Sequence, residues 1–457
     1  MCTFAPKISF VRMKIRQFCI TLLSLFTASI MLQAKTWTLE ECIQYAMDNN
    51  ITLHKAGLTR QTSEETLKSS RAQLFPSLTF TTSQNVAYNP WRASNSSTVM
   101  GSEVEQTSKT TSYNGSYRVA SKWTVWDGNR NHNTVKQNTI LEQAAEQDSI
   151  VSARNIEEQI SKLYIQILYS KEAVGVAEET LEAAKVNERR GLEMVDVGSM
   201  SKAECSQLTA TRAQDEYNVV KAQGNVLNFK RQLKALLQII DEEDFDIAPG
   251  RATDDMALEQ VPSLSAVFEE ARRNRPELKK AQLSVASAEL QQKIGKAQRY
   301  PTVSFEGAVG TTNSSLSKNA WGDQIRSNFN VGGGLTVSVP IFDQRASRTA
   351  INKANIQRQT ALLDILDKET ALHSTIESYW IDANNYQSQF KAARVSSSAA
   401  KDSYDLLSEQ FAVGLKNVVE LQDGKTRLLT ARQNELQAKY STILALQMLE
   451  FYQKKGE

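Results

Sequence analysis

Two long stretches without proline constrain this 457-residue chain more than any other feature. No proline occurs between Pro90 and Pro249, and none follows Pro340. Within both stretches apolar and small residues recur at alternating steps of four and three, the spacing of a coiled-coil seam. A helix expected over 129–194 would be ~99 Å long at 1.5 Å per residue. Such a helix cannot wrap around an ordinary globular core, so the sequence predicts an elongated protein.

Each seam ends at a glycine. One seam runs from Ile365 to Phe411, and its part from Leu372 onward has a counterpart 216 residues earlier, from Ile156 to Val195. Glycine readily adopts the positive φ that ends a helix, so we expect two helical hairpins that turn at Val-Gly pairs. The expected hairpins cover 128–238 and 344–455. The pairs, each followed six residues on by a glutamate, are Val197-Gly198 with Glu204 and Val413-Gly414 with Glu420.

The hairpins belong to a unit that occurs twice. Residues 39–80 align without a gap with 264–305, and Pro76 then matches Pro301. Further on, Asp127 matches Asp343, and both aspartates precede a long helix that they are expected to cap. The sequence therefore predicts a first structural repeat over 35–250 and a second over 251–457.

Between the helices the pattern changes to period two, which is typical of β-strands. The alternation occurs in pairs around polar loops, and a soluble sheet would show the same pattern. Strands of this length with aromatic ends also fit a membrane sheet. Four strands cannot close a barrel, because the smallest membrane barrels have eight, so three copies would share one of twelve strands. The expected strands are 77–88, 113–126, 302–312 and 328–341, and the loops are 89–112 and 313–327.

The N-terminal residues resemble an export signal. Lys14 and Arg16 precede a short apolar run from Cys19 to Met31, a pattern that predicts a signal peptide over 1–34, with Met13 as an alternative start. The run is shorter than the ~20 residues of a transmembrane helix. A buried N-terminal helix is the alternative.

Composition and motifs exclude several classes. A net charge of +2 argues against a nucleic-acid partner, and a mean hydropathy of −0.41 excludes a multi-helix membrane protein. Beyond the signal peptide only Cys42 and Cys205 remain, and three scattered histidines make no metal site. Gly424-Lys425-Thr426 resembles a phosphate-binding loop, but Val419 stands where glycine is required. We therefore expect no catalysis, cofactor or bound metal.

Together these features resemble the outer-membrane efflux protein (TolC) family over nearly the whole mature chain. The residues that carry the resemblance are the Val-Gly turns, Phe75-Pro76, Tyr300-Pro301 and the run 339–343. The resemblance implies a mainly α fold with a β-barrel portion, in which helical hairpins form an α-barrel and three chains form a 12-stranded barrel. It also implies a homotrimer in the outer-membrane lipid of a Gram-negative bacterium, with a tunnel through the periplasm.

The family's function is passive export in tripartite efflux or type I secretion systems. The implied partners are a periplasmic adaptor and an inner-membrane pump of the resistance-nodulation-division or ABC type. The nine methionines are dispersed, so multidrug export of small organic solutes is favoured over soft metals. Two alternatives remain: a periplasmic coiled-coil structural or adaptor protein without a pore, and an enzyme with a hairpin insertion. The empty motif search argues against the enzyme.

The resemblance places adaptor docking and the gate at the hairpin tips. Glu420 and Asp423 correspond to two acidic rings, and Lys416 to an arginine that ties neighbouring hairpins shut, with Glu204 as its acidic partner. Phe411 stands where the family can place a tyrosine. Lysine lacks the bidentate geometry of arginine, so we expect a weaker closed state. The docking tips are Val197, Gly198, Ser199 and Met200 in the first hairpin, and Val413, Gly414 and Leu415 in the second.

The acidic pair has a physical meaning without the family. Glu420 and Asp423 are three residues apart and share one helix face. Three copies would place six carboxylates around a narrow pore, and such a ring favours cations and can bind divalent ions. The alternative interpretation is an ordinary solvated helix face.

Overall fold

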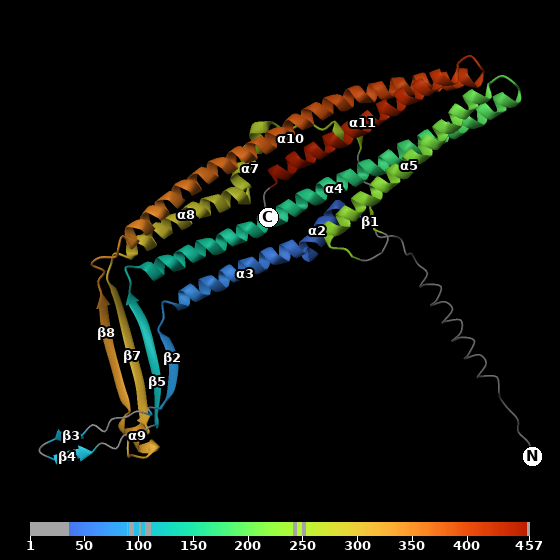
Figure 1. The fold of residues 1–457 in the computed structure, drawn as a ribbon. Helices are drawn as coiled ribbons and strands as arrows, with labels where there is room; N and C mark the ends of the chain where they lie inside the picture. The colour runs from blue at the N-terminus through green and yellow to red at the C-terminus, as the bar shows by residue number, and fades with distance from the viewer. Residues whose placement is uncertain are drawn as a thin grey trace, which may run out of the picture. The chain divides into compact units, whose positions relative to one another are not determined.

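The structure is a computed structural model of the chain. It consists mainly of helices with one four-stranded sheet, as the fold class predicted (Figure 1). The predicted signal peptide, residues 1–34, lies outside the described residues. The residues that the structure describes are 36–88, 90, 96–99, 102–105, 111–240, 245–248 and 253–454.

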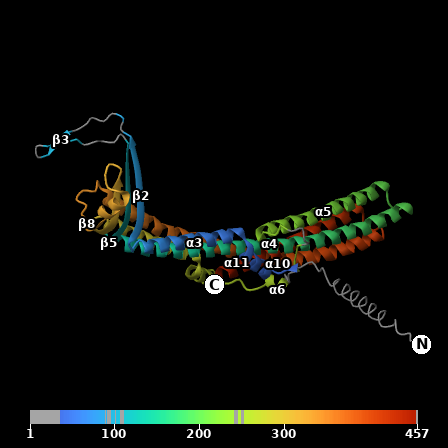
Figure 2. The same ribbon diagram turned by 90° about the horizontal axis from the view of Figure 1, so that it is seen from below.

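Four long helices form two antiparallel hairpins that lie side by side (Figures 1 and 2). Each outgoing helix has 67 residues, or ~100 Å of helix. Each return helix has 36 residues. The bounds are α4 Arg130–Asp196, α5 Lys202–Leu237, α10 Ala346–Ala412 and α11 Val418–Gln453.

Burial along the outgoing helices follows a heptad. Every seventh residue of α10 from Ile376 to Phe411 is buried. A repeat of seven keeps one stripe of the helix facing its partner as the helices supercoil. The buried stripe thus coincides with the seam that the sequence indicates. The six residues are Ile376, Ala383, Phe390, Ser397, Tyr404 and Phe411.

Shorter elements complete the described chain. Helix α8 is held between two long helices by ion pairs, Lys280 with Asp148 of α4 at 2.6 Å and Glu289 with Arg358 of α10 at 2.9 Å. The bounds are β1 Thr36–Trp37, α2 Leu39–Asn49, α3 Ile51–Ala72, β3 Ser96–Val99, β4 Ser102–Glu105, β6 Asp246–Ile247, α6 Asp254–Ala257, α7 Leu264–Asn274, α8 Pro276–Ala297 and α9 Trp321–Ser327.

Four strands form an antiparallel sheet in the order β2-β5-β7-β8. The expected loop 89–112 contains the paired strands β3 and β4, and two further features differ from the sequence prediction. Strand β8 ends at Ser338 rather than at residue 341, because Pro340 lacks the N–H that a ladder needs. The expected loop 313–327 also contains helix α9. The bounds are β2 Ser77–Tyr88, β5 Thr111–Trp126, β7 Thr302–Ser314 and β8 Asn330–Ser338.

The two faces of this sheet differ in chemistry. One face carries apolar rows that cross the strands, and the other carries Lys122 paired with Glu306 at 3.4 Å. The apolar side chains of the edge strands are exposed; Phe80 and Val331, for example, retain 64% and 69% of their accessible surface. The rows follow from the strand register: Phe80, Val119, Val309 and Val331 in one, and Trp123, Phe305 and Leu335 in another.

The same tight turn joins sheet to long helix in both halves. Asp127 and Asp343 are followed by two residues with positive φ, Gly128 and Asn129 in one turn and Gln344 and Arg345 in the other. Each aspartate then accepts a hydrogen bond from the backbone N–H four residues on, at 3.0 and 2.9 Å. The two aspartates therefore cap the long helices as expected, but each lies about one turn before the first residue of its helix.

The chain divides into two compact units that cut across the predicted repeats. The hairpin unit comprises described residues up to His54, Ala153–Ala271 and Ser374–Lys454. The sheet unit comprises Lys55–Ser152 and Arg272–His373. Each predicted repeat contributes to both units, and the repeat boundaries near residue 250 stay a prediction.

Candidate gate and docking tips

Both hairpins turn through the same backbone geometry. Gly198 and Gly414 each have φ of 78°, and open space surrounds both. The N–H of Ser199 donates to the carbonyl of Met194 at 2.8 Å, and the N–H of Leu415 donates to that of Gln410 at 2.9 Å. These are the closing bonds of a Schellman motif, in which glycine supplies the left-handed residue.

The tips expose apolar side chains to solvent. Val197, Val413 and Leu415 retain 79%, 70% and 74% of their accessible surface. These three residues predicted for adaptor docking are therefore accessible within the single chain. Exposed apolar residues on a short turn are suited to pack against another protein.

The glutamate six residues after each glycine has a structural role. Glu204 accepts from the N–H of Ser201 at 3.0 Å, while Ser201 Oγ accepts from the N–H of Glu204 at 3.2 Å. Glu420 forms the same reciprocal pair with Asn417 at the start of α11. Both are capping boxes, which satisfy N–H groups that a helix start leaves free. This explains the recurring glutamate without reference to a gate.

Within the single chain, Lys416 and Glu204 each have a local partner. Lys416 Nζ lies 2.6 Å from Glu420 Oε1 in its own hairpin, whereas Glu204 is engaged by Ser201. The hydrogen bond from Lys416 keeps the pKa of the Glu420 carboxyl below its usual value, with a smaller effect from Asn417 N–H. A Lys416–Glu204 contact is not formed within the described single chain, so the predicted tie between neighbouring hairpins stays a prediction.

Asp423 lies one turn beyond Glu420 on α11. Its carboxylate is 2.9 Å from Arg427, and both side chains are largely exposed. Exposed i,i+4 pairs contribute ~0.5 kcal/mol or less, so Asp423 is only loosely held. The carboxylates of Glu420 and Asp423 are therefore both accessible, and Asp423 is held only by a weak, exposed ion pair.

Phe411 lies inside the protein rather than on its surface. The side chain is fully buried in a cluster with Tyr404, Val418 and Leu421 of its own hairpin and Leu208 of the other. Met200 of the first tip packs against the same cluster. The phenylalanine therefore contributes apolar packing between the two hairpins, just behind their tips.

Each hairpin also contains a glycine that accommodates a leucine. A Cβ on Gly191 of α4 would lie 2.5 Å from Leu208 of α5, and a Cβ on Gly424 of α11 would lie 2.6 Å from Leu407 of α10. At the repeat offset of 216, Gly191 corresponds to Leu407 and Leu208 corresponds to Gly424. The two hairpins thus use the same pair with the partners exchanged.

Sequence reasoning missed a buried ion pair between the hairpins. Lys425 of α11 contacts Asp215 of α5, and their side chains are only 10% and 7% exposed. Nearby, the Asn187 amide of α4 donates to the Tyr404 hydroxyl of α10 at 3.0 Å. Lys425 stands out in the sequence only through its likeness to a phosphate-binding loop. No local pattern links it to an aspartate 210 residues away.

Among the described residues there is no metal-binding cluster, no disulfide bond and no membrane-spanning helix. No group of three or more His, Cys, Asp or Glu side chains with metal-binding geometry occurs among them. Cys42 and Cys205 are both free and buried. In this part of the chain no helix combines the length and apolarity needed to cross a bilayer.

A sheet with one apolar face and long helical hairpins are the elements of an outer-membrane channel protein. The sequence profile described as "Outer membrane efflux protein" matches residues 42–237 and 267–452, which is most of the chain. The chain belongs to this family. Its members are channels rather than enzymes, so the protein is an outer-membrane channel.

Individual relatives agree with the family. The chain is 22% identical to outer membrane protein TolC of Vibrio cholerae serotype O1, over 94% of each sequence. It is 23% identical to TolC of Escherichia coli K12, over 50% of this chain and 46% of that protein.

Solved structures share the fold. The outer membrane channel CmeC of Campylobacter jejuni superimposes with a TM-score of 0.74 at 16% identity, over 92% of this chain and 86% of CmeC. The outer membrane protein VceC of Vibrio cholerae gives a TM-score of 0.72 at 16% identity, over 92% of this chain and 97% of VceC.

Proposed function

We propose that three copies of this chain form the outer-membrane conduit of an export system. The observation that carries the proposal is the sheet with two open edges. Within the described residues, β2 pairs only with β5 and β8 only with β7. In lipid each unpaired backbone group costs several kcal/mol, so open edges cannot remain there. Pairing β8 of one copy with β2 of the next removes the edges, and three copies give twelve strands.

The two sheet faces suit this arrangement. The apolar rows through Phe80 and Trp123 contact lipid, and the face with Lys122 and Glu306 lines a water-filled interior. The long hairpins extend the conduit into the periplasm. Their tips dock to a periplasmic adaptor, which links the conduit to an inner-membrane pump of an efflux or type I secretion system.

A matched pair of substitutions tests the lipid-facing assignment. Arginine on the lipid face near mid-bilayer costs ~2–4 kcal/mol, whereas arginine in the lumen is tolerated. We expect Phe80→Arg to reduce the outer-membrane trimer strongly and Thr79→Arg, one residue away on the opposite face, to leave it unchanged. Membrane fractionation and light scattering on the extracted protein, built of 51.0 kDa chains, provide the measurement.

The possible results separate the hypotheses clearly. Equal effects of the two substitutions would contradict the assignment of faces. A water-soluble monomer after signal removal would contradict the conduit and favour a periplasmic rod without a pore.

The gate is a further part of the proposal. Glu420 and Asp423 from three copies form two acidic rings near the tips, and Lys416 helps to hold the closed state. Accessible carboxylates in a narrow pore attract cations, so the rings bind divalent ions and reduce conductance. The exposure of Asp423 supports this assignment, whereas capping and the Lys416 ion pair account for Glu420 within one chain.

The capping role of Glu420 decides how the gate is tested. Alanine would remove charge and cap together, but glutamine keeps the capping box. In planar bilayers we expect Glu420→Gln with Asp423→Asn to weaken block by divalent cations. Glu182→Gln makes the same charge change at an exposed position of α4 outside the tips, so it is the control and leaves the block unchanged. Unchanged block in the double variant would place the cation site elsewhere.

A further inference from the structure

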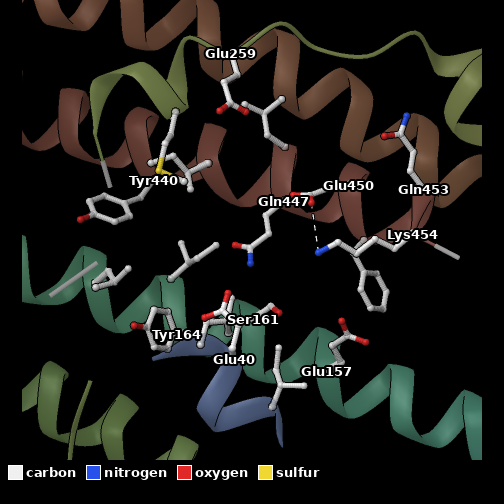
Figure 3. Close-up of a pocket in the computed structure, with 18 of the residues that line it drawn as sticks. Glu40, Glu157, Ser161, Tyr164, Glu259, Tyr440, Gln447, Glu450, Gln453 and Lys454 are labelled. Atoms are coloured by element: carbon white, nitrogen blue, oxygen red, sulfur yellow. Dashed lines mark ion pairs between the residues drawn. The ribbon is translucent and has the colours of Figure 1, made fainter. Parts of the chain in front are cut away.

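A cavity of about 840 Å³ lies within the hairpin unit, well before the tips (Figure 3). Its walls come from α2, from α4 between Glu157 and Leu168, from the segment 256–262, and from the last turns of α11. Cavities of roughly 300–1,000 Å³ are the size that holds small organic ligands. None of the gate or tip residues lines it.

Part of the lining is apolar and fixed. Tyr164, Ile443 and Phe451 are buried in the surrounding core and present side chains to the cavity. The Tyr164 hydroxyl donates to the carbonyls of Trp37 and Ala248, and burial raises the pKa of Tyr164 to about 12. The tyrosine is therefore neutral with its hydroxyl engaged elsewhere, which leaves its ring as an apolar surface.

The remaining lining is strongly acidic. Four carboxylates line the cavity and Lys454 is the one cation among the described lining residues. Lys454 lies 3.3 Å from Glu450 and offsets that charge. Glu40, Glu157 and Glu259 form no ion pair within the described chain. Figure 3 shows Glu40 on the wall opposite Glu259, so the uncompensated charge faces the cavity from two sides.

A hydroxyl without a protein partner faces the cavity. Ser161 is 4% exposed and lines the cavity next to Tyr164 and Glu40 (Figure 3). Helical serines commonly bond to the carbonyl four residues earlier, as Ser170 does to Gln166 at 2.8 Å. Ser161 forms no hydrogen bond to any described residue. The hydroxyl oxygen is not among the fully buried side-chain atoms that lack a partner, so it is reached from the cavity and is available to a group inside it.

We propose that the cavity binds an amphipathic organic amine. The protonated amine donates to Ser161 Oγ and to the Glu157 carboxylate, and the apolar part packs against Tyr164 and Phe451. Charge-assisted hydrogen bonds are about twice as strong as neutral ones, which favours an ammonium over an alcohol. This site goes beyond the proposed conduit, because it assigns a ligand to a place away from the gate.

Equilibrium dialysis on the purified full chain in lipid nanodiscs tests the site. The probe is 2-(1-naphthyl)ethylamine, and 2-(1-naphthyl)ethanol is its uncharged match. Nanodiscs without protein correct for uptake into lipid. We expect the amine to bind and the alcohol to bind at least about tenfold more weakly.

Two variants and one control locate the binding. Glu157→Gln keeps the shape of the side chain and should raise the Kd of the amine about tenfold, and Ser161→Ala should raise it about threefold. Glu182→Gln makes the same charge change at an exposed position of the same helix and should leave the Kd unchanged. Equal binding of amine and alcohol, equal effects of Glu157→Gln and Glu182→Gln, or no binding of the amine would each overturn the proposal. None of these results depends on conductance, so the conduit proposal stands or falls separately.

Discussion

Replacing Lys425 by methionine isolates the buried link between the hairpins. The change keeps most of the side-chain volume and leaves Asp215, only 7% exposed, without its cation. Breaking a buried pair in this way costs ~3–5 kcal/mol, because the remaining charge stays desolvated. Each 1.4 kcal/mol is a factor of ten, so local opening of α5 should become roughly two to three orders of magnitude more frequent.

Hydrogen–deuterium exchange with mass spectrometry on the purified channel measures this opening. We expect peptides of α5 around Asp215 to lose protection in Lys425→Met, while peptides of α3 in the sheet unit keep theirs. Adding Asp215→Leu removes the orphan charge and replaces the pair by an apolar contact of similar volume, so protection should return to wild-type level or above. Wild-type exchange in the single variant, or a double variant as fast as the single, would refute a buried pair between the hairpins.

Two further predictions concern the hairpin ends. Gly191→Leu should overpack against Leu208, and Leu208→Gly should leave a cavity, at a cost of ~2–5 kcal/mol each. The double variant reproduces the arrangement of the second hairpin and should recover most of the thermal stability. A double variant no more stable than the single variants would contradict the packing described. The pKa of Glu204 is lowered by its capping partner Ser201, and the pKa of Glu420 is lowered by Lys416 first and then by its capping partner Asn417. Both carboxylates therefore contribute stability above the unfolded pKa near 4.5 that is lost as pH falls through the folded pKa. Tip amides should therefore exchange faster as the pH falls below that value, and Glu204→Gln with Glu420→Gln should flatten the dependence.

Regular, local patterns made much of this fold predictable. The heptad seam of α10 needs only the spacing of residues such as Phe390 and Tyr404, and both are buried where the spacing requires. The break at Gly414 could be recognised because few residues adopt a positive φ readily. Strand β2 follows from alternation between residues 77 and 88. Helix α9 was missed because seven residues are too short for a helical period to stand out.

The candidate site was less predictable because its contacts are not local. Alignment identified Glu420, but not that its two carboxylate oxygens contact Lys416 and Asn417 of the same hairpin. The Lys425–Asp215 pair joins helices from different repeats, and neither residue has a charged counterpart at the repeat offset. Sequence spacing within one helix carries no information about a partner on another helix. The cavity beside Ser161 was missed for the same reason.

Because the glycine and the leucine change places between the two hairpins, the outgoing helix of each hairpin fits only its own return helix. Joining α4 to a return helix copied from α11 would set Gly191 against Gly424 and leave a void. Joining α10 to a copy of α5 would force Leu407 against Leu208. Recombination between the halves can therefore succeed only where whole hairpins are exchanged, with crossover points outside the helices rather than at the turns.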